Sequence, residues 1–216
     1  AHKSGPISDV VCIPGADGDE LWLKVKRYVG GATVRYIEVL SYFDDDTAKE
    51  DGIFVDSAIS YSGASAATLT GLWHLRGATV KYLANGTVGS GTVSATGNLT
   101  LAAAATKVHI GYSYTAKAES LDYEAGAAAG TSQGRQKRIS NVTLRLHRSV
   151  GGSAGISTSH DAIRYDDQTT PTALFTGDRP VVMPSGWDSK CSVYVEHSDP
   201  TPFMVLAIMP ELSTTG

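Results

Sequence analysis

The chain has 216 residues, of which 42% are hydrophobic and 19% are charged, and its formal net charge is -4. Soluble domains usually contain about 25% charged residues, so this composition excludes disorder over the whole length. The negative net charge gives nucleic acid no general attraction, and a nucleic-acid binder would therefore need a local basic patch. No apolar run approaches the ~20 residues that a membrane-spanning helix requires.

A two-residue period marks the segment ELWLKVKRYV, residues 20–29. One face of this segment is mainly aliphatic and comprises Leu21, Leu23, Val25, Arg27 and Val29. Such alternation predicts a strand with that face toward a core. Gly30 and Gly31 follow, and a glycine pair supplies the positive φ angles of a two-residue turn. Because ATVRYIEVLSYF continues the alternation, we expect a β-hairpin.

Short strand-like runs follow one another between Thr68 and Tyr114, each ended by glycine, asparagine or small residues. The runs are LTGLWHLRG, ATVKYLANG, TVGSGTVSATG, NLTLAAAA and TKVHIGYSY. Asn85-Gly86 is the strongest turn signal among them. About five strands in so short a segment favour a small barrel or a compact sandwich.

Residues 116–134 contain few large apolar side chains, which predicts a connecting loop. Alternation returns in RISNVTLRLHRSVGG, where we expect Val142, Leu144 and Leu146 to face inward. The segment FMVLAIM, residues 203–209, is continuously apolar. That pattern predicts a strand covered on both faces, or a short buried segment.

Many short strands and no amphipathic helix pattern predict an all-β, antiparallel protein. We expect a sandwich-like outer domain built from residues 1–65 and 135–216. A small β-barrel of about five short strands, residues 66–115, would be inserted between its halves. Residues 116–134 would form the connecting loop.

Candidate metal ligands and catalytic groups are scattered. The six histidines show none of the spacings that bring two ligands onto one face. Acidic residues gather at Asp44, Asp45 and Asp46, and with His160 at Asp161, Asp166 and Asp167. Without the Ca²⁺-loop spacing, we interpret both groups as solvated loops. Asp56 with Glu196 stays open as a glycosidase-like carboxylate pair, without an aromatic cleft pattern beside it. We expect no catalytic residue, metal or cofactor.

Positive charge concentrates in one short span. It comprises Arg135, Lys137, Arg138, Arg145 and Arg148, beside His147. Two interpretations stay open, of which we favour the first. The span is either a solvated strand face whose charges pair with a neighbouring subunit, or the lining of a channel along which DNA slides through weak backbone contacts.

The order of motifs resembles a known family. The motifs are DELWLKVKRYVGGATVRYIEVLSYF, IFVDSAISYSG, GLWHLRGATVKYLANG, ATKVHIGYSY, GRQKRISNVTLRLHRS, LFTGD and PFMVLAIMPEL. Over nearly all of residues 9–211 they resemble the C-terminal part of the tail nozzle, or tail tubular protein B, and related packaged-DNA stabilisation proteins of short-tailed phages. The central unit is also similar to the small β-barrel half-domain of ubiquitin-activating enzymes. No cysteine lies between Cys12 and Cys191, so that likeness implies no activating chemistry.

The resemblance implies a structural virion protein rather than an enzyme. Its expected partners are copies of itself in a ring, an adaptor or head-to-tail connector protein, tail fibres and the exiting genome DNA. The family's proteins are several times longer and contain a β-propeller-like body. Because the chain begins at Ala1 and its first methionine is Met183, we expect it to be the distal portion of a longer protein.

A carbohydrate-binding or host-receptor-binding β-module is the alternative. In that case Trp22, Trp73 and Trp187 would stack on sugar rings. Tryptophans that face a core would argue against this alternative.

Overall fold

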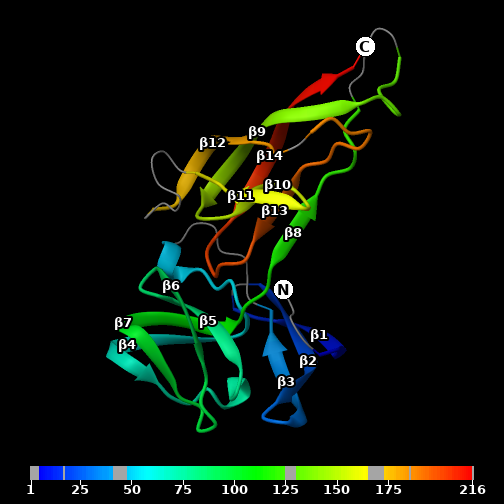
Figure 1. The fold of residues 1–216 in the computed structure, drawn as a ribbon. Coiled ribbons are helices and arrows are strands. Elements are labelled where there is room, and N and C mark those ends of the chain that lie inside the picture. Colours follow the sequence, from blue (N-terminus) through cyan, green and yellow to red (C-terminus); the bar gives the residue numbers. More distant parts are fainter. Residues whose placement is uncertain are drawn as a thin grey trace. The chain divides into compact units, whose positions relative to one another are not determined.

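The computed structural model describes residues 5–16, 18–40, 48–124, 130–164, 173–184 and 186–215. The chain divides into two compact units, Ala1–Tyr114 and Thr115–Gly216. The regular secondary structure of both units consists almost wholly of antiparallel strands (Figure 1), which confirms the all-β prediction. Within the described ranges the helical elements are two short 3-10 helices, η1 (Lys49–Asp51) and η2 (Trp73–Leu75). None of the described helices is long and apolar enough to cross a membrane.

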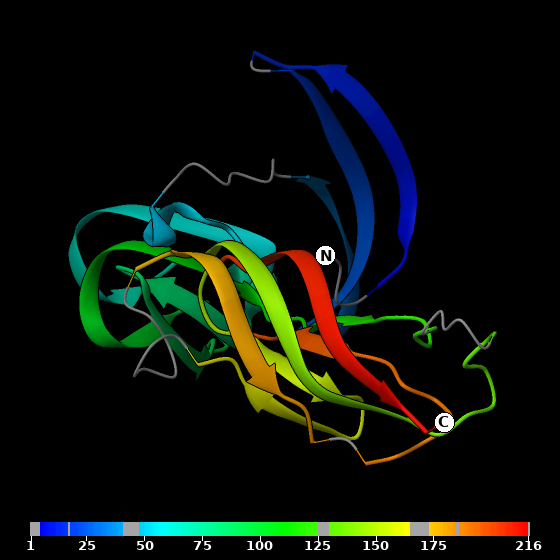
Figure 2. The same ribbon diagram turned by 90° about the horizontal axis from the view of Figure 1, so that it is seen from above.

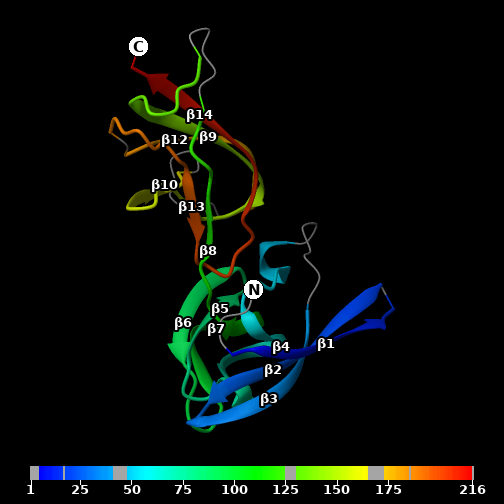
Figure 3. The same ribbon diagram turned by 90° about the vertical axis from the view of Figure 1, so that its right-hand side faces the viewer.

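The first unit begins with a three-stranded sheet in the order β1-β2-β3 (Figure 3). Its strands are β1 (Ile7–Pro14), β2 (Asp19–Val29) and β3 (Ala32–Val39). Gly30 and Gly31 have φ angles of 58° and 87°, the left-handed values that the two-residue turn requires. Val25 and Val29 are buried on the predicted inward face. The predicted hairpin is therefore confirmed.

The second sheet of this unit has the order β4-β7-β5-β6. Its strands are β4 (Asp56–Leu69), β5 (Thr79–Ala84), β6 (Thr87–Thr92) and β7 (Leu99–Tyr112). The prediction of about five short strands is wrong, because NLTLAAAA and TKVHIGYSY join into the 14-residue strand β7. Alanines lack the chemistry that starts a turn, so the strand continues through them. LTGLWHLRG instead holds the end of β4 and the helix η2.

One apolar cluster underlies the second sheet, with members from all its long strands and from η2. Leu75, Val93 and Ile110 are among its fully buried side chains. Asn85 and Gly86, with φ angles of 46° and 76°, form the predicted turn between β5 and β6. This sheet and its cluster are complete within residues before Thr115.

The second unit contains two sheets, in the orders β11-β10-β13-β8 and β12-β9-β14. Its strands are β8 (Ala116–Glu119), β9 (Lys137–Ser149), β10 (Ser153–Ile156), β11 (Ser159–Ala162), β12 (Phe175–Val182), β13 (Tyr194–His197) and β14 (Met204–Thr214). Both sheets contribute to one buried cluster. Val142, Leu144 and Leu146 lie in that cluster, as their alternation predicted.

The predicted domain division differs from the observed one. Residues 1–65 belong to the first unit and do not join residues 135–216. Residues 116–119 are not a loop, because they form β8 and pair with β13. The side chains of β8 are all exposed, so hydrophobic alternation could not reveal it. Leu206, which is 58% exposed on β14 at a sheet edge, corrects the expectation of a strand covered on both faces.

Candidate functional site

A cleft of about 710 Å³ lies in the first unit, between the β2–β3 hairpin and the beginning of β4. Its walls are mainly aliphatic and aromatic, and they include Leu21, Leu23, Tyr36, Ile53, Ile59 and Tyr114. The inward face of the hairpin extends beyond the buried core. Val25 and Val29 are buried, whereas Leu21, at the other end of β2, is 37% exposed and lines the cleft. A concave apolar surface with a few polar groups is the usual form of a binding site.

A buried guanidinium lies close to two acidic residues that line the cleft. Arg27 Nε donates to Glu38 Oε1 at 2.6 Å. Its Nη1 and Nη2 donate to the Asp56 carboxylate at 2.9 Å and 2.8 Å. Burial alone would lower the pKa of Arg27, but the hydrogen bonds that its guanidinium donates to Glu38 and Asp56, together with the charges of these carboxylates, outweigh burial and raise the pKa. Two carboxylates against one guanidinium leave the group with one negative charge.

Ser57 and His74 complete the polar corner of the cleft. Ser57 has a φ angle of 53°, a left-handed conformation that costs a serine energy and is common at functional sites. Its carbonyl oxygen accepts a hydrogen bond of 3.1 Å from His74 Nε2. Burial lowers the pKa of His74. The imidazole is therefore neutral near pH 7 and donates to Ser57 in a fixed orientation.

The β1-β2-β3 sheet is exposed to an unusual extent. Every residue of β1 is exposed, and Figure 2 shows β1 and β2 side by side as a curved ribbon. Val10 and Val11, whose side chains point to opposite faces, are 55% and 53% exposed, and Ile37 on β3 is 74% exposed. Among the described strands, β1 and β3 each pair on one side only. The sheet thus presents apolar side chains on both faces and an open edge on each side.

The predicted basic group does not form one exposed face. Lys137 is fully buried, and its Nζ donates to Asp122 Oδ2 at 2.6 Å and to the Tyr123 carbonyl oxygen at 3.0 Å. Its interpretation as a DNA or subunit contact is therefore wrong. Burial removes the hydration of an ammonium group, so a partner of opposite charge must compensate for that loss.

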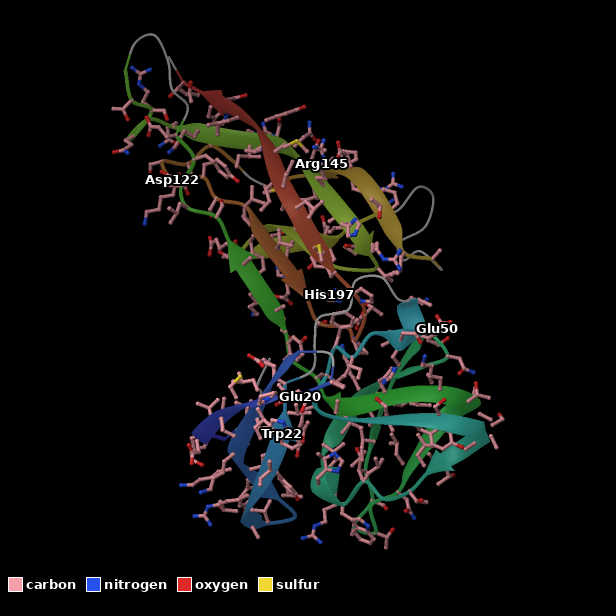
Figure 4. The ribbon with its side chains drawn as sticks, turned by 180° about the vertical axis from the view of Figure 1, so that it is seen from behind. Glu20, Trp22, Glu50, Asp122, Arg145 and His197 are labelled. Atoms are coloured by element: carbon pink, nitrogen blue, oxygen red, sulfur yellow. The ribbon has the colours of Figure 1, made fainter. Side chains whose placement is uncertain are left out.

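The four arginines of that group differ in their surroundings. Arg145, labelled in Figure 4, is exposed. It binds Asp178 of β12 through two hydrogen bonds of 2.7 Å and 2.9 Å. Arg138 is exposed, whereas Arg135 and Arg148 are half-buried. Arg148 also has a φ angle of 43°, where β9 departs from regular pairing. Arg138 and Arg145 are thus the exposed arginines of this group, and Arg145 is bound to Asp178.

The three tryptophans are not core residues. Trp22 is half-buried, and its Nε1 donates to Glu20 Oε2 at 2.9 Å on the same strand (Figure 4). Trp73 in the first unit is 57% exposed, and Trp187 in the second unit is 50% exposed. The structure therefore leaves two indole rings accessible, one in each unit.

The two carboxylates considered as a glycosidase-like pair each bind a partner within their own unit. Asp56 belongs to the first unit, where it binds Arg27, and Glu196 belongs to the second, where it accepts a hydrogen bond from Tyr194 at 2.5 Å. The described residues contain no group of three or more histidines, cysteines or carboxylates that could hold a metal ion. Asp44, Asp45, Asp46, Asp166 and Asp167 lie outside the described residues.

Comparison with models of known protein families finds no match, and comparison with curated proteins finds none either. The open sheet and the cleft were not predicted from the sequence. A signal for the cleft exists, because Arg27 occupies an inward position in an otherwise aliphatic face. A cation at an inward position indicates that the fold brings carboxylates close to it, but it does not identify those carboxylates.

Proposed function

We propose that this chain is a structural subunit of a phage tail, of the nozzle type, that acts by assembling with copies of itself. The exposed β1-β2-β3 sheet carries the proposal, with Val10, Val11 and Ile37 all more than half exposed. Exposed apolar side chains that gather on one element of a soluble protein often mark an interaction site, and this sheet exposes them on both of its faces. The motif order that resembles tail nozzle proteins supports a virion setting.

In such a conduit the subunit contacts an adaptor or head-to-tail connector protein, tail fibres and the passing genome. In this proposal the subunit acts through its shape and its contacts and catalyses no reaction. Arg138, together with Arg135 and Arg148, supplies the positive charge for non-specific contact with DNA. Lys137 takes no part in that contact because it is buried, and Arg145 is already bound to Asp178. Weak phosphate contacts of this kind would let DNA slide.

Two measurements test the assembly proposal. Negative-stain electron microscopy of the chain should show rings, and a persistent monomer at high concentration would contradict the proposal. Immunogold labelling of phage particles with an antibody against this chain should mark the tail. Unlabelled particles would contradict the virion setting.

The DNA contact has its own test. Arg135, Arg138 and Arg148 changed together to glutamine should weaken retention of duplex DNA and reduce its salt dependence. Gel-shift titrations at several salt concentrations measure both the affinity and its salt dependence. Lys137→Met is not a suitable control because it perturbs the core. Arg145→Gln is the matched control, and an equal loss there would count against the assignment.

A carbohydrate- or host-receptor-binding module remains the second candidate, favoured by the exposure of Trp73 and Trp187. Soluble host polysaccharide should then quench tryptophan fluorescence. Replacing Trp73 or Trp187 with alanine should remove the quenching, while Trp22→Phe should leave it. Absence of quenching at millimolar glycan would exclude this candidate.

A further inference from the structure

We propose that the β1-β2-β3 sheet continues from copy to copy, with β1 of one copy adding as a parallel strand to the open edge of β3 in the next. The occupant of the β3 edge is thus a second copy of this chain. The inference rests on the proposed self-assembly and names the surface that performs it. It requires that both edges offer backbone groups, that their side chains match, and that the contact can repeat.

The open edge of β3 offers alternate backbone groups. In a hairpin with a two-residue turn, Val29 and Ala32 form a hydrogen-bonded pair, so every second residue of β3 from Ala32 onward bonds to β2. The hydrogen bond from Leu40 N to the Leu21 carbonyl oxygen, 2.9 Å, agrees with this phase. The amides of the intervening residues therefore point away from β2: Thr33, Arg35, Ile37 and Val39.

On β1, too, every second residue directs its backbone groups away from β2. Residues of β2 that do not bond to β3 bond to β1, as the hydrogen bond of 3.1 Å from Lys26 N to the Pro6 carbonyl oxygen illustrates. Val11, opposite Trp22, consequently bonds inward. The amide groups of Val10 and Cys12 point outward. The Val10 amide donates to Asp9 Oδ1 of its own strand at 3.0 Å, so the Cys12 amide is the outward donor of this pair. The outward carbonyl groups of Val10 and Cys12 remain as acceptors. Both edges thus offer outward backbone groups at alternate residues, which is what strand addition uses.

Charge selects one alignment of the two edges. On its own sheet Arg35 lies opposite Lys26, and like charges in directly opposite positions are unfavourable. A parallel alignment that places the partner's Asp9 beside Arg35 would relieve this repulsion. The same alignment places the partner's Val11 beside Ile37 and the partner's Ile13 beside Val39. One ion pair and two apolar pairs thus arise from a single register.

On the opposite face of the sheet, the proposed strand contact lies beside the cleft. Val10 and Cys12 pair with Leu23 and Leu21, so their side chains lie on the face of the sheet that lines the cleft. In the proposed register the partner's Val10 and Cys12 would stand next to Tyr36 and Glu38. The partner strand would therefore cover part of the largely apolar cleft wall.

The directions of β1 and β3 allow the proposed contact to repeat from copy to copy. β1 and β3 both run antiparallel to β2 and hence run in the same direction as each other. A ring whose axis lies along the strands keeps every copy in the same orientation, so β3 and the next β1 meet in parallel. Such a contact joins two different surfaces and can close into a ring, whereas a twofold contact between two β1 strands stops at a dimer.

A charge exchange tests the register on the intact chain. Asp9→Arg alone and Arg35→Asp alone should each weaken self-association at low salt by about tenfold, because each places like charges side by side. The double variant should restore association to within about threefold of the natural chain. Sedimentation velocity measures this, with Arg164→Asp in the second unit as the matched control. A double variant as weak as the single variants would overturn the register.

Cross-linking tests the strand pair itself. In a Cys12→Ser background, Val11→Cys with Ile37→Cys should give a ladder of disulfide-linked oligomers after copper-phenanthroline oxidation, read on a non-reducing gel. Val11→Cys with Thr33→Cys, four positions out of register, is the control and should link poorly. Efficient dimers from Val11→Cys alone would show twofold β1 pairing and overturn the inference. Rings that form without the ladder would overturn it too, and would leave the proposed function intact.

Discussion

At the residue scale, two fully buried cations tie distant segments together. Arg27 and Lys137 both occupy inward positions of alternating strands, at which an aliphatic side chain would ordinarily be found. Removing a charge from water is costly unless a partner of opposite charge is present, and each of these residues has one or two carboxylates. The loss of a carboxylate should therefore matter more than the loss of the whole ion pair.

Asp56→Asn should lower the free energy of unfolding of the first unit by about 3 kcal/mol, because it leaves the buried Arg27 with Glu38 alone. Glu38→Gln should cost less, since the Glu38 side chain is 20% exposed and that of Asp56 only 6%. Urea unfolding followed at Trp22 and Trp73 in a Trp187→Phe background measures both. A larger effect for Glu38→Gln would contradict this ranking.

Asp122→Ala should destabilise the second unit, because the Lys137 ammonium would stay buried without its carboxylate. The Asp122 side chain is 41% exposed, so we expect a loss of about 2 kcal/mol, below the range for a fully buried pair. Asp122→Ala combined with Lys137→Met should recover much of the loss. Urea unfolding followed at Trp187 tests this, and a double variant less stable than Asp122→Ala would contradict it.

The same pair predicts a dependence on pH. The hydrogen bond from Lys137, followed by that from the Cys191 amide, lowers the pKa of Asp122 below its ordinary value of 3.8. A carboxylate with a lowered pKa stabilises the native state above the unfolded pKa, and this contribution is lost as the pH falls through the native pKa. The difference in melting temperature between the natural chain and Asp122→Ala should therefore shrink below pH 3.8. A constant difference would contradict the assignment.

At the scale of elements, the turn between β5 and β6 combines a backbone requirement with a side-chain one. Asn85 adopts a φ angle of 46°. Its Oδ1 also accepts hydrogen bonds from the backbone amides of Thr106 and Lys107, at 3.2 Å and 3.0 Å. One residue therefore closes the β5–β6 turn and fastens it to β7.

Asn85→Ala should cost the first unit about 2 kcal/mol, because alanine resists the left-handed region and cannot accept the two hydrogen bonds. Asn85→Asp retains an acceptor and tolerates that region, so it should stay within about 0.5 kcal/mol of the natural chain. Thermal unfolding measures both changes. Equal losses would show that neither the acceptor nor the backbone conformation matters.

At the scale of the whole molecule, the chain consists of two consecutive units, each with its own buried cluster. All sheet pairings of the described strands stay within one unit. This organisation differs from an insertion into a divided sandwich and has a direct consequence for fragments.

Fragments 1–114 and 115–216 should each fold alone, with cooperative thermal unfolding and dispersed amide resonances. Fragment 66–115, the insert predicted from sequence, should not fold, because it lacks most of β4, the partner of β7. Circular dichroism melts of the three fragments decide between the two divisions. A cooperative transition in fragment 66–115 would favour the inserted-barrel division.

The local features of the fold could be predicted from the sequence alone. Alternation in 20–29 and 137–149 and the glycine pair at 30–31 specify strands and a turn through side-chain direction and φ, which neighbouring residues determine. The run of alanines in β7 was harder to interpret, because consecutive alanines show no alternation of apolar and polar side chains that would indicate a strand.

Only the tertiary structure decided which strands pair, which edges remain open and which charges are buried. Arg27 meets Asp56 across 29 residues, and Lys137 meets Asp122 across 15. No local pattern distinguishes such a cation from one on a solvated face, because its burial depends on a carboxylate that the fold brings near. For the same reason the sequence placed Lys137 on a contact surface, and the cleft and the open sheet became visible only in three dimensions.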